Sequence, residues 1–123
     1  QVSKKKINSN LEKQLSAMLW QLIADTKTPL EAETVFSEIF TDMEVSTLAK
    51  RLGVAYWLSK NRSYDNIKTN LKVSSATVAD IQPKIKRAGW KLALRKMTAD
   101  EWATVWENKI KHVLHKFRRP KTN

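Results

Sequence analysis

The sequence of 123 residues has room for one domain, or for one domain with a tail. It contains no cysteine, which excludes disulfides and thiolate metal sites. It has no apolar run of about 18 residues, and its basic start leads into polar residues, so we expect neither a membrane span nor a secretory signal. With only two glycines and three prolines, the chain lacks the turn residues that sheets need, which favours an all-α fold.

The net charge of +11 is unevenly placed along the chain. Residues 1–44 hold five lysines and seven acids, for a net charge of −2. Residues 45–123 hold 18 lysines and arginines and five acids, for a net charge of +13. A charge that served only solubility would have no reason to collect in one part of the chain, whereas the footprint of a polyanion would.

Six helices are expected, and most of their starts carry a Ser or Thr followed three residues later by Glu, the pattern of a capping box. The four such pairs are Ser9–Glu12, Thr28–Glu31, Thr41–Glu44 and Thr98–Glu101. Two further starts, at Ser63 and Ser74, lack the Glu. The predicted helices cover about 10–26, 29–40, 42–61, 64–71, 75 onward and 99–117. They form one predicted domain over 9–117, between basic arms at 1–8 and 118–123 that we expect to be disordered.

The first and last predicted helices carry wide apolar faces. On the first, these residues are Leu11, Leu15, Met18, Leu19 and Leu22; on the last they include Trp102, Val105, Trp106, Ile110 and Phe117. One small core does not readily cover so much apolar surface, which favours a dimer interface. The alternative is that both helices pack on the middle of the same chain.

The stretch from residue 63 to 88 has the pattern of a helix-turn-helix. Its first helix is expected to bury Ile67 and Leu71, and its connection to place Val73 in the angle between the helices. Inward positions on the second helix are predicted to be Ala76, Val78 and Ile81. Short polar side chains at the start of that helix suit a surface that meets base edges in the major groove.

Dense positive charge follows this pattern, with no acid anywhere in residues 81–98. Cations placed beside a groove-reading helix can contact the flanking phosphates. The predicted DNA-binding residues are Ser63, Tyr64, Lys72, Ser74, Ser75, Thr77, Asp80, Lys84, Lys86, Arg87 and Lys91.

From Thr41 to Ile85 the sequence resembles the Trp-repressor superfamily, especially its YerC/YecD-like branch. The residues that carry the resemblance are Leu48-Ala49-Lys50-Arg51-Leu52, Val54-Ala55, Leu58, Arg62-Ser63-Tyr64, Ile67 and Ser75-Ala76-Thr77-Val78. The resemblance implies a six-helix domain that pairs as an intertwined homodimer and regulates transcription by binding double-stranded DNA.

The chain departs from the family pattern at three places. Trp repressor holds its tryptophan co-repressor between two arginines; Arg51 stands at the first of these positions, but Asp80 stands at the second. An acid would repel the carboxylate of an amino acid, so we expect no tryptophan binding. Lys72 occupies a turn position where the family prefers glycine, at a strain of roughly 1 kcal/mol if its φ is positive. Pro83 is expected to kink or end the recognition helix near Ile81.

Several side chains admit two interpretations. Asp80 can accept a hydrogen bond from cytosine N4, or pair with Lys84 one turn later, and we favour the pair. Thr77 is expected to contact a base or phosphate, although a solvated helix start is the alternative. Trp90 is kept as a nucleic-acid contact. His112 and His115 have no third ligand nearby, so no metal is expected.

The sequence shows no arrangement of a nucleophile with its base and no phosphate-binding glycine loop, so we expect neither an enzyme nor a cofactor. The favoured hypothesis is a homodimeric, sequence-specific transcription regulator in the cytoplasm, associated with the nucleoid. The first alternative is an architectural or RNA-associated protein that binds without reading sequence. The second is the DNA-binding module of a recombination or replication factor.

Overall fold

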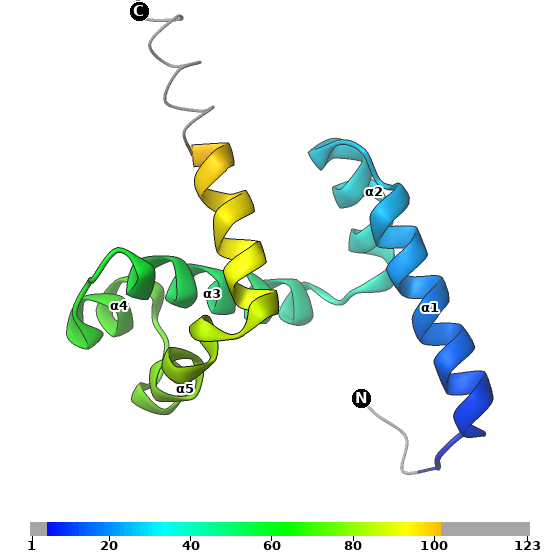
Figure 1. Cartoon of the computed structure of the whole chain (residues 1–123), viewed down its shortest axis with the longest axis horizontal. Coiled ribbons are helices and arrows are strands. Elements are labelled where there is room, and N and C mark those ends of the chain that lie inside the picture. Colours follow the sequence, from blue (N-terminus) through cyan, green and yellow to red (C-terminus); the bar gives the residue numbers. More distant parts are fainter. Residues whose placement is uncertain (1–4, 102–123) are drawn as a thin grey trace, which may run out of the picture. The chain divides into compact units, whose positions relative to one another are not determined.

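The computed structural model describes residues 5–101, and all regular structure within this range is helical (Figure 1). The elements are α1 (Ser9–Asp25), α2 (Pro29–Ile39), α3 (Asp42–Ser59), α4 (Tyr64–Leu71), α5 (Ser75–Ile81) and the 3-10 helix η1 (Gln82–Lys86). A further helix begins at residue 88 and continues to the last described residue, 101. The predicted all-α class is therefore confirmed. Within residues 5–101, no helix is long and apolar enough to cross a membrane.

Most of the predicted helix starts are present, and their caps explain why the helices begin where they do. The Thr41 hydroxyl accepts from the Glu44 N–H at 3.1 Å, and the Glu44 carboxylate accepts from the Thr41 N–H at 2.8 Å, which completes a capping box. These bonds hold the pKa of Glu44 below its ordinary value. The Thr28 hydroxyl caps α2 by accepting from the Glu31 N–H at 3.1 Å, but the Glu31 carboxylate accepts from the Lys27 N–H at 3.2 Å and not from that of Thr28.

Two predicted starts are wrong. The cap of α1 is Asn8, whose side chain accepts from the Asn10 N–H at 2.8 Å, so Ser9 is already the first helical residue. Thr98 is not a helix start, because it lies inside the helix that begins at residue 88. Its hydroxyl donates to the Leu94 carbonyl oxygen at 2.8 Å, the bond of a threonine in a helix interior. The rest of the predicted last helix, with Trp102 and Trp106, lies outside the described residues.

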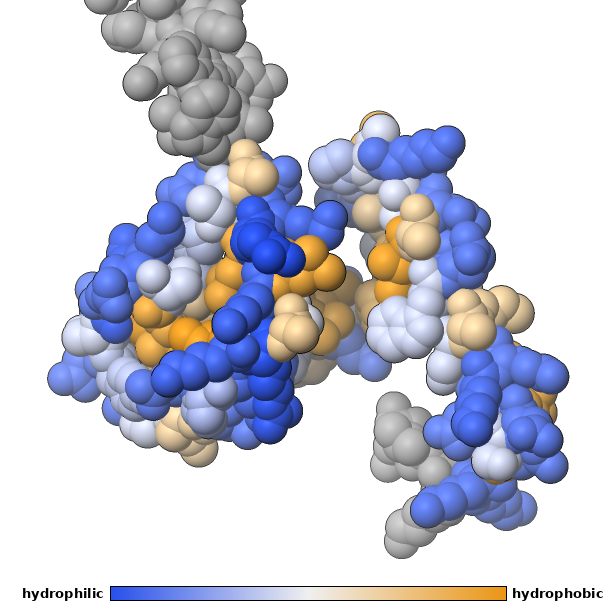
Figure 2. All heavy atoms as spheres, in the orientation of Figure 1, coloured by the Kyte–Doolittle hydropathy of each residue, from blue (hydrophilic) through white to orange (hydrophobic). Residues whose placement is uncertain are grey.

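The chain divides into two compact units, Gln1–Ser46 and Thr47–Asn123, and each is described by itself. In the first unit, α1 and α2 contain no buried residue. Its best-covered apolar side chains are only half-buried, and they include Phe36 and Phe40, whose rings stack at 5.8 Å. Large apolar side chains such as Met18 and Leu30 remain 67% and 72% exposed. Figure 2 shows this apolar surface between the charged side chains of the unit.

The second unit contains the buried core of the described chain. Five apolar residues are fully buried and come from α3, α4 and α5: Val54, Ala55, Ile67, Val78 and Ile81. Half-buried side chains complete the cluster, among them Trp57, Leu58, Leu71, Val73, Ile85, Trp90 and Leu94. The last two come from the helix that begins at residue 88. This core therefore joins α4 and α5 to α3 and to that helix.

Gly53 lets α3 and α4 approach each other closely. A Cβ atom at this position would lie 3.1 Å from the Leu71 Cδ1 atom of α4. Contacts of this length are shorter than ordinary van der Waals separations, so a side chain at residue 53 would displace Leu71. Gly89 has no such neighbour, because a Cβ atom there meets nothing within 4 Å.

Candidate nucleic-acid interface

The connection between α4 and α5 is a tight turn whose geometry is set by two residues. Lys72 ends α4 in the left-handed region, with φ 56° and ψ 48°. Ser74 then caps α5 by accepting from the Thr77 N–H at 3.1 Å. Between them, Val73 packs against the buried core, as predicted. Lys72 therefore has the positive φ under which the sequence analysis expects strain, and the turn fixes the crossing of the two helices.

The recognition helix predicted from Ser75 onward corresponds to α5, and its inner face is formed by Val78 and Ile81, both fully buried. Ala76 was predicted to face inward, but it is exposed together with Ser75 and Ala79. Thr77 is half-buried rather than fully outward, and its hydroxyl lies 3.0 Å from the Ser74 hydroxyl. In a helix of seven residues, two large apolar side chains suffice for the inner face, so Ala76 is left on the open side.

Pro83 ends α5 where the sequence predicts. The α-helix stops at Ile81, and the chain continues as η1, so the helix-turn-helix proper ends seven residues before the predicted boundary at residue 88. Tyr64, the first residue of α4, donates its phenolic hydrogen to the Gln82 side-chain oxygen. This bond ties the start of the helix-turn-helix to its end.

The predicted cations fall into two groups, one exposed near α5 and one that lines a hollow. Lys72, Lys86 and Arg87 are exposed, and none of the ion pairs found within residues 5–101 involves them. Lys91 instead lines a shallow hollow with Lys60 and Arg95, between the end of α3 and the helix that begins at residue 88. The predicted cations therefore do not form a single cluster: some surround the turn and η1, and Lys91 belongs to the hollow.

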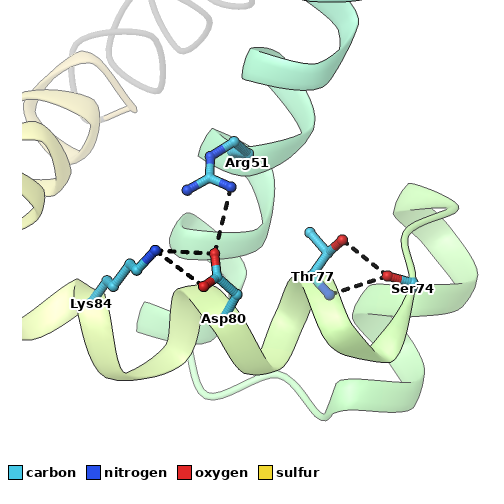
Figure 3. Close-up of polar contacts among 5 residues, drawn as sticks. All are labelled: Arg51, Ser74, Thr77, Asp80 and Lys84. Atoms are coloured by element: carbon cyan, nitrogen blue, oxygen red, sulfur yellow. Dashed lines mark hydrogen bonds and ion pairs between the residues drawn. The ribbon is translucent and has the colours of Figure 1, made fainter.

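Asp80 pairs with two cations, one of which the sequence analysis missed. Its carboxylate lies 3.1 Å from the Lys84 Nζ atom, which is the predicted pair, and 3.7 Å from an Arg51 guanidinium nitrogen (Figure 3). The hydrogen bond and charge of Lys84, with a smaller contribution from Arg51, hold the pKa of Asp80 below its ordinary value. The family resemblance places residues 51 and 80 on either side of one ligand, and therefore close together. Because Arg51 and Asp80 have opposite charges, this ion pair could have been predicted.

Two further expectations concern Trp90 and the histidine pair. Trp90 was kept as a nucleic-acid contact, but it packs against the buried core and its ring is half-buried. The part of the indole that packs on the core is not available to a base, and contact of its exposed part with nucleic acid stays a prediction. His112 and His115 lie outside the described residues. Ser63 and Ser74 use their hydroxyls to cap α4 and α5, respectively.

These features define a class. Two short helices joined by a tight turn, with small exposed side chains on the second helix and cations beside it, are the architecture of a helix-turn-helix DNA-binding protein. A family model described as Trp repressor protein matches residues 13–98. The chain belongs to the Trp repressor family, whose members are DNA-binding transcription regulators and not enzymes. No curated protein and no solved structure matches the chain.

Proposed function

We propose that this protein is a sequence-specific transcription regulator of the YerC/YecD-like branch that places α5 in the major groove of duplex DNA. The observation that carries the proposal is the exposed surface of α5, where Ser75, Ala76 and Ala79 present small side chains beside Asp80. Small side chains let a helix approach base edges closely. Lys72, in the turn before α5, and Lys86 and Arg87, after Ile81, are all exposed and precede and follow the recognition helix along the chain, where we expect them to contact phosphates beside the groove.

The test is a selection of bound duplexes from a random pool with the full chain, at about 150 mM salt to suppress purely electrostatic binding. We expect a palindromic sequence to be enriched. Thr77→Val should weaken binding to the enriched duplex by about tenfold, the scale of one lost base contact, while Thr77→Ser should preserve it. Binding without any enriched sequence would instead establish the architectural or RNA-associated role, and the proposed sequence reading would be wrong.

We further propose that the protein acts as an intertwined homodimer. The first unit has no buried residue, and it exposes Leu11, Leu15 and Met18 along one side of α1 by 45%, 46% and 67%. On α3, Val45, Leu48 and Leu52 are each more than 40% exposed as well. Burial of apolar surface stabilises by about 25 cal/mol per Å², so an uncovered face of this extent is costly in water. A second copy of the chain supplies a complementary apolar face by symmetry.

The molar mass of the full chain in solution, measured by light scattering, tests this part of the proposal. We expect twice the mass of the 14.2 kDa chain. Leu15→Glu should shift the population to the monomer, because it places a charge in the interface. The exposed Lys13→Glu on the same helix is the control and should leave the dimer intact. A wild-type monomer with normal stability would show that the two units cover each other within one chain.

We propose, finally, that tryptophan is not a co-repressor here. Arg51, which stands at one of the two family positions for the ligand, is already paired with Asp80 at 3.7 Å. A carboxylate ligand would have to displace Asp80 from Arg51 and then remain beside that negative charge. We expect millimolar L-tryptophan to leave the affinity for the enriched duplex unchanged. An increase of tenfold or more would contradict this proposal.

A further inference from the structure

Asp80 is the only acidic residue between residues 66 and 99, a stretch that holds eight lysines and arginines. Its two carboxylate oxygens connect α5, which carries Asp80, to α3 and to η1. Oδ2 lies 3.7 Å from the Arg51 Nη1 atom of α3, while Oδ1 and Oδ2 lie 3.1 and 3.2 Å from the Lys84 Nζ atom of η1 (Figure 3). The side chains approach Asp80 from different elements, so the carboxylate lies between them.

The length of α5 makes such a connection necessary. A helix of seven residues is far below the 12–15 residues at which isolated helices become marginally stable, so its position depends on its contacts. Its backbone packs on α4 and η1. Its contacts with α3 come from side chains, which are the buried Val78 and Ile81 against the core and Asp80 against Arg51. Apolar contacts resist separation from the core, but they do not fix the rotation of a short helix as a directed ion pair does.

We propose that Asp80 is a positioning residue, which locks the rotation of the recognition helix against α3 through Arg51 and against η1 through Lys84. This inference rests on the proposed function of α5 as the reading helix. With the rotation fixed, the small residues Ser75, Ala76 and Ala79 stay on the exposed side. The lock also occupies Arg51 and Lys84, which leaves Lys72, Lys86 and Arg87 as the cations for phosphate. Asp80 thus contributes to sequence preference although it lowers the positive charge of the surface.

The first measurement needs no DNA. Hydrogen exchange of the backbone amides of Ala79, Asp80 and Ile81 in α5, and of the Gln82 amide that bonds to the Val78 carbonyl oxygen, reports how often the helix opens in the free protein. Arg51→Gln lies far from α5 in sequence, so it leaves the intrinsic exchange rates of these amides unchanged. We expect Arg51→Gln and Asp80→Asn each to accelerate exchange of the α5 amides by roughly threefold to fivefold, the range open to a partly exposed ion pair. The double variant should be no faster than Asp80→Asn alone, because Asp80→Asn already breaks the Arg51 pair together with the Lys84 pair.

The second measurement is the ratio of affinities for the enriched duplex and for a scrambled one. We expect Asp80→Asn and Arg51→Gln both to lower this ratio by roughly threefold to fivefold, although they change the net charge in opposite directions. Asp65→Asn is the matched control, since it removes an exposed acid from α4 that takes part in none of the ion pairs within residues 5–101. It should leave both the exchange of the α5 amides and the ratio unchanged.

The outcomes separate three roles for Asp80. If Asp80→Asn strengthens binding to both duplexes equally and leaves the exchange rates alone, Asp80 acts only through its charge and the proposal is overturned. If preference is lost at a single base pair while exchange stays slow, Asp80 is a base contact, which also overturns it. If no sequence is enriched at all, the proposed function fails, and the exchange measurement still decides whether the lock exists.

Discussion

Lys72 holds a backbone conformation that suits glycine better than lysine. Its φ of 56° places its Cβ atom close to the following carbonyl oxygen, at a cost of about 1–2 kcal/mol for an L-residue. Asn61 has a similar φ of 61°, but asparagine tolerates this region well. We therefore expect Lys72→Gly to raise the free energy of unfolding by about 1 kcal/mol, and Asn61→Gly to change it by much less. Urea unfolding of both variants checks this, and equal effects at both positions would contradict it.

At the residue scale, the sequence predicted the caps Ser63 and Ser74 and the pair of Asp80 with Lys84, because each depends on neighbours within four positions. For Lys72 it predicted strain only on the condition of a positive φ, which the structure supplies. It did not predict the Arg51–Asp80 pair, whose partners are 29 positions apart. It also placed Ala76 inside. A small apolar residue carries too little hydrophobic free energy to decide which way a helix turns.

Among the helices, α3 and the helix that begins at residue 88 each contain one of the two glycines, in opposite environments. Glycine in a helix interior costs about 0.8–1 kcal/mol relative to alanine. Because a Cβ atom at Gly89 meets nothing within 4 Å, Gly89→Ala should stabilise the protein by about 0.5–1 kcal/mol. At Gly53, Leu71 stands only 3.1 Å from the added Cβ. Gly53→Val should therefore destabilise by about 1–3 kcal/mol, as overpacking does.

Thermal unfolding of the two variants provides the measurement, with Gly53→Ala as the intermediate case. For this variant the gain in helix propensity and the displacement of Leu71 oppose each other, so we expect a smaller change than for either of the other two. Stabilisation by Gly53→Val would show that α3 and α4 are less closely packed than the 3.1 Å approach indicates.

A tyrosine and a glutamate link the same two helices, and their pKa values predict how this contact depends on pH. The hydrogen bond to Glu101 raises the pKa of Tyr56 above its ordinary 10.0, and the same bond lowers the pKa of Glu101 below its ordinary 4.5. The tyrosine part of the stabilisation is present below pH 10 and is lost as the pH rises through the raised pKa. The glutamate part is present above pH 4.5 and is lost as the pH falls through the lowered pKa.

We therefore expect the difference in urea midpoint between the wild type and Tyr56→Phe to be constant at neutral pH and to shrink at both extremes. Lys60, which lies 3.3 Å from Glu101, keeps part of the contact in the variant. Glu101→Gln is the companion variant, and it should remove the acid side of the profile. A difference that stays unchanged at alkaline pH would mean that the Tyr56 hydroxyl does not contribute to the contact.

At the scale of the elements, the starts of the first five helices were predicted to within one residue, but the start of the last one was misplaced. The residues from 88 to 98 include alanine, leucine, lysine, arginine and methionine, all strong helix formers. The Thr98–Glu101 pattern resembles a capping box, but such a box forms only where the preceding chain is extended. Here it is already helical, so the Thr98 hydroxyl bonds backward to Leu94.

On the scale of the whole molecule, the two sequence parts differ in both charge and burial. Residues 1–44 are slightly acidic, and their helices α1 and α2 bury nothing by themselves. Residues 45–123 carry the net charge of +13 and the five buried core residues. The spacing of apolar residues predicted which helix faces are apolar. It does not predict which surface packs on them, because that surface belongs to residues distant in sequence or to another chain. The proposed dimerisation would use the first part and the proposed DNA contacts the second.

This division predicts how the salt dependence of DNA binding responds to substitutions. The slope of log affinity against log salt concentration changes by about 0.9 for each phosphate contact in duplex DNA. Because the proposed dimer would carry every substitution twice, Arg87→Gln should reduce the magnitude of the slope by about 1.8. Lys13→Gln on α1 should leave the slope unchanged.

Titrations with the enriched duplex at several salt concentrations would check this prediction. A decrease of only about 0.9 for Arg87→Gln would indicate that one protomer of the dimer contacts phosphate through this residue, or that a monomer binds. The measured mass of the chain separates those two cases. Equal decreases for Arg87→Gln and Lys13→Gln would show that the affinity follows total charge rather than position. The separation of a pairing half from a DNA-contacting half would then be wrong.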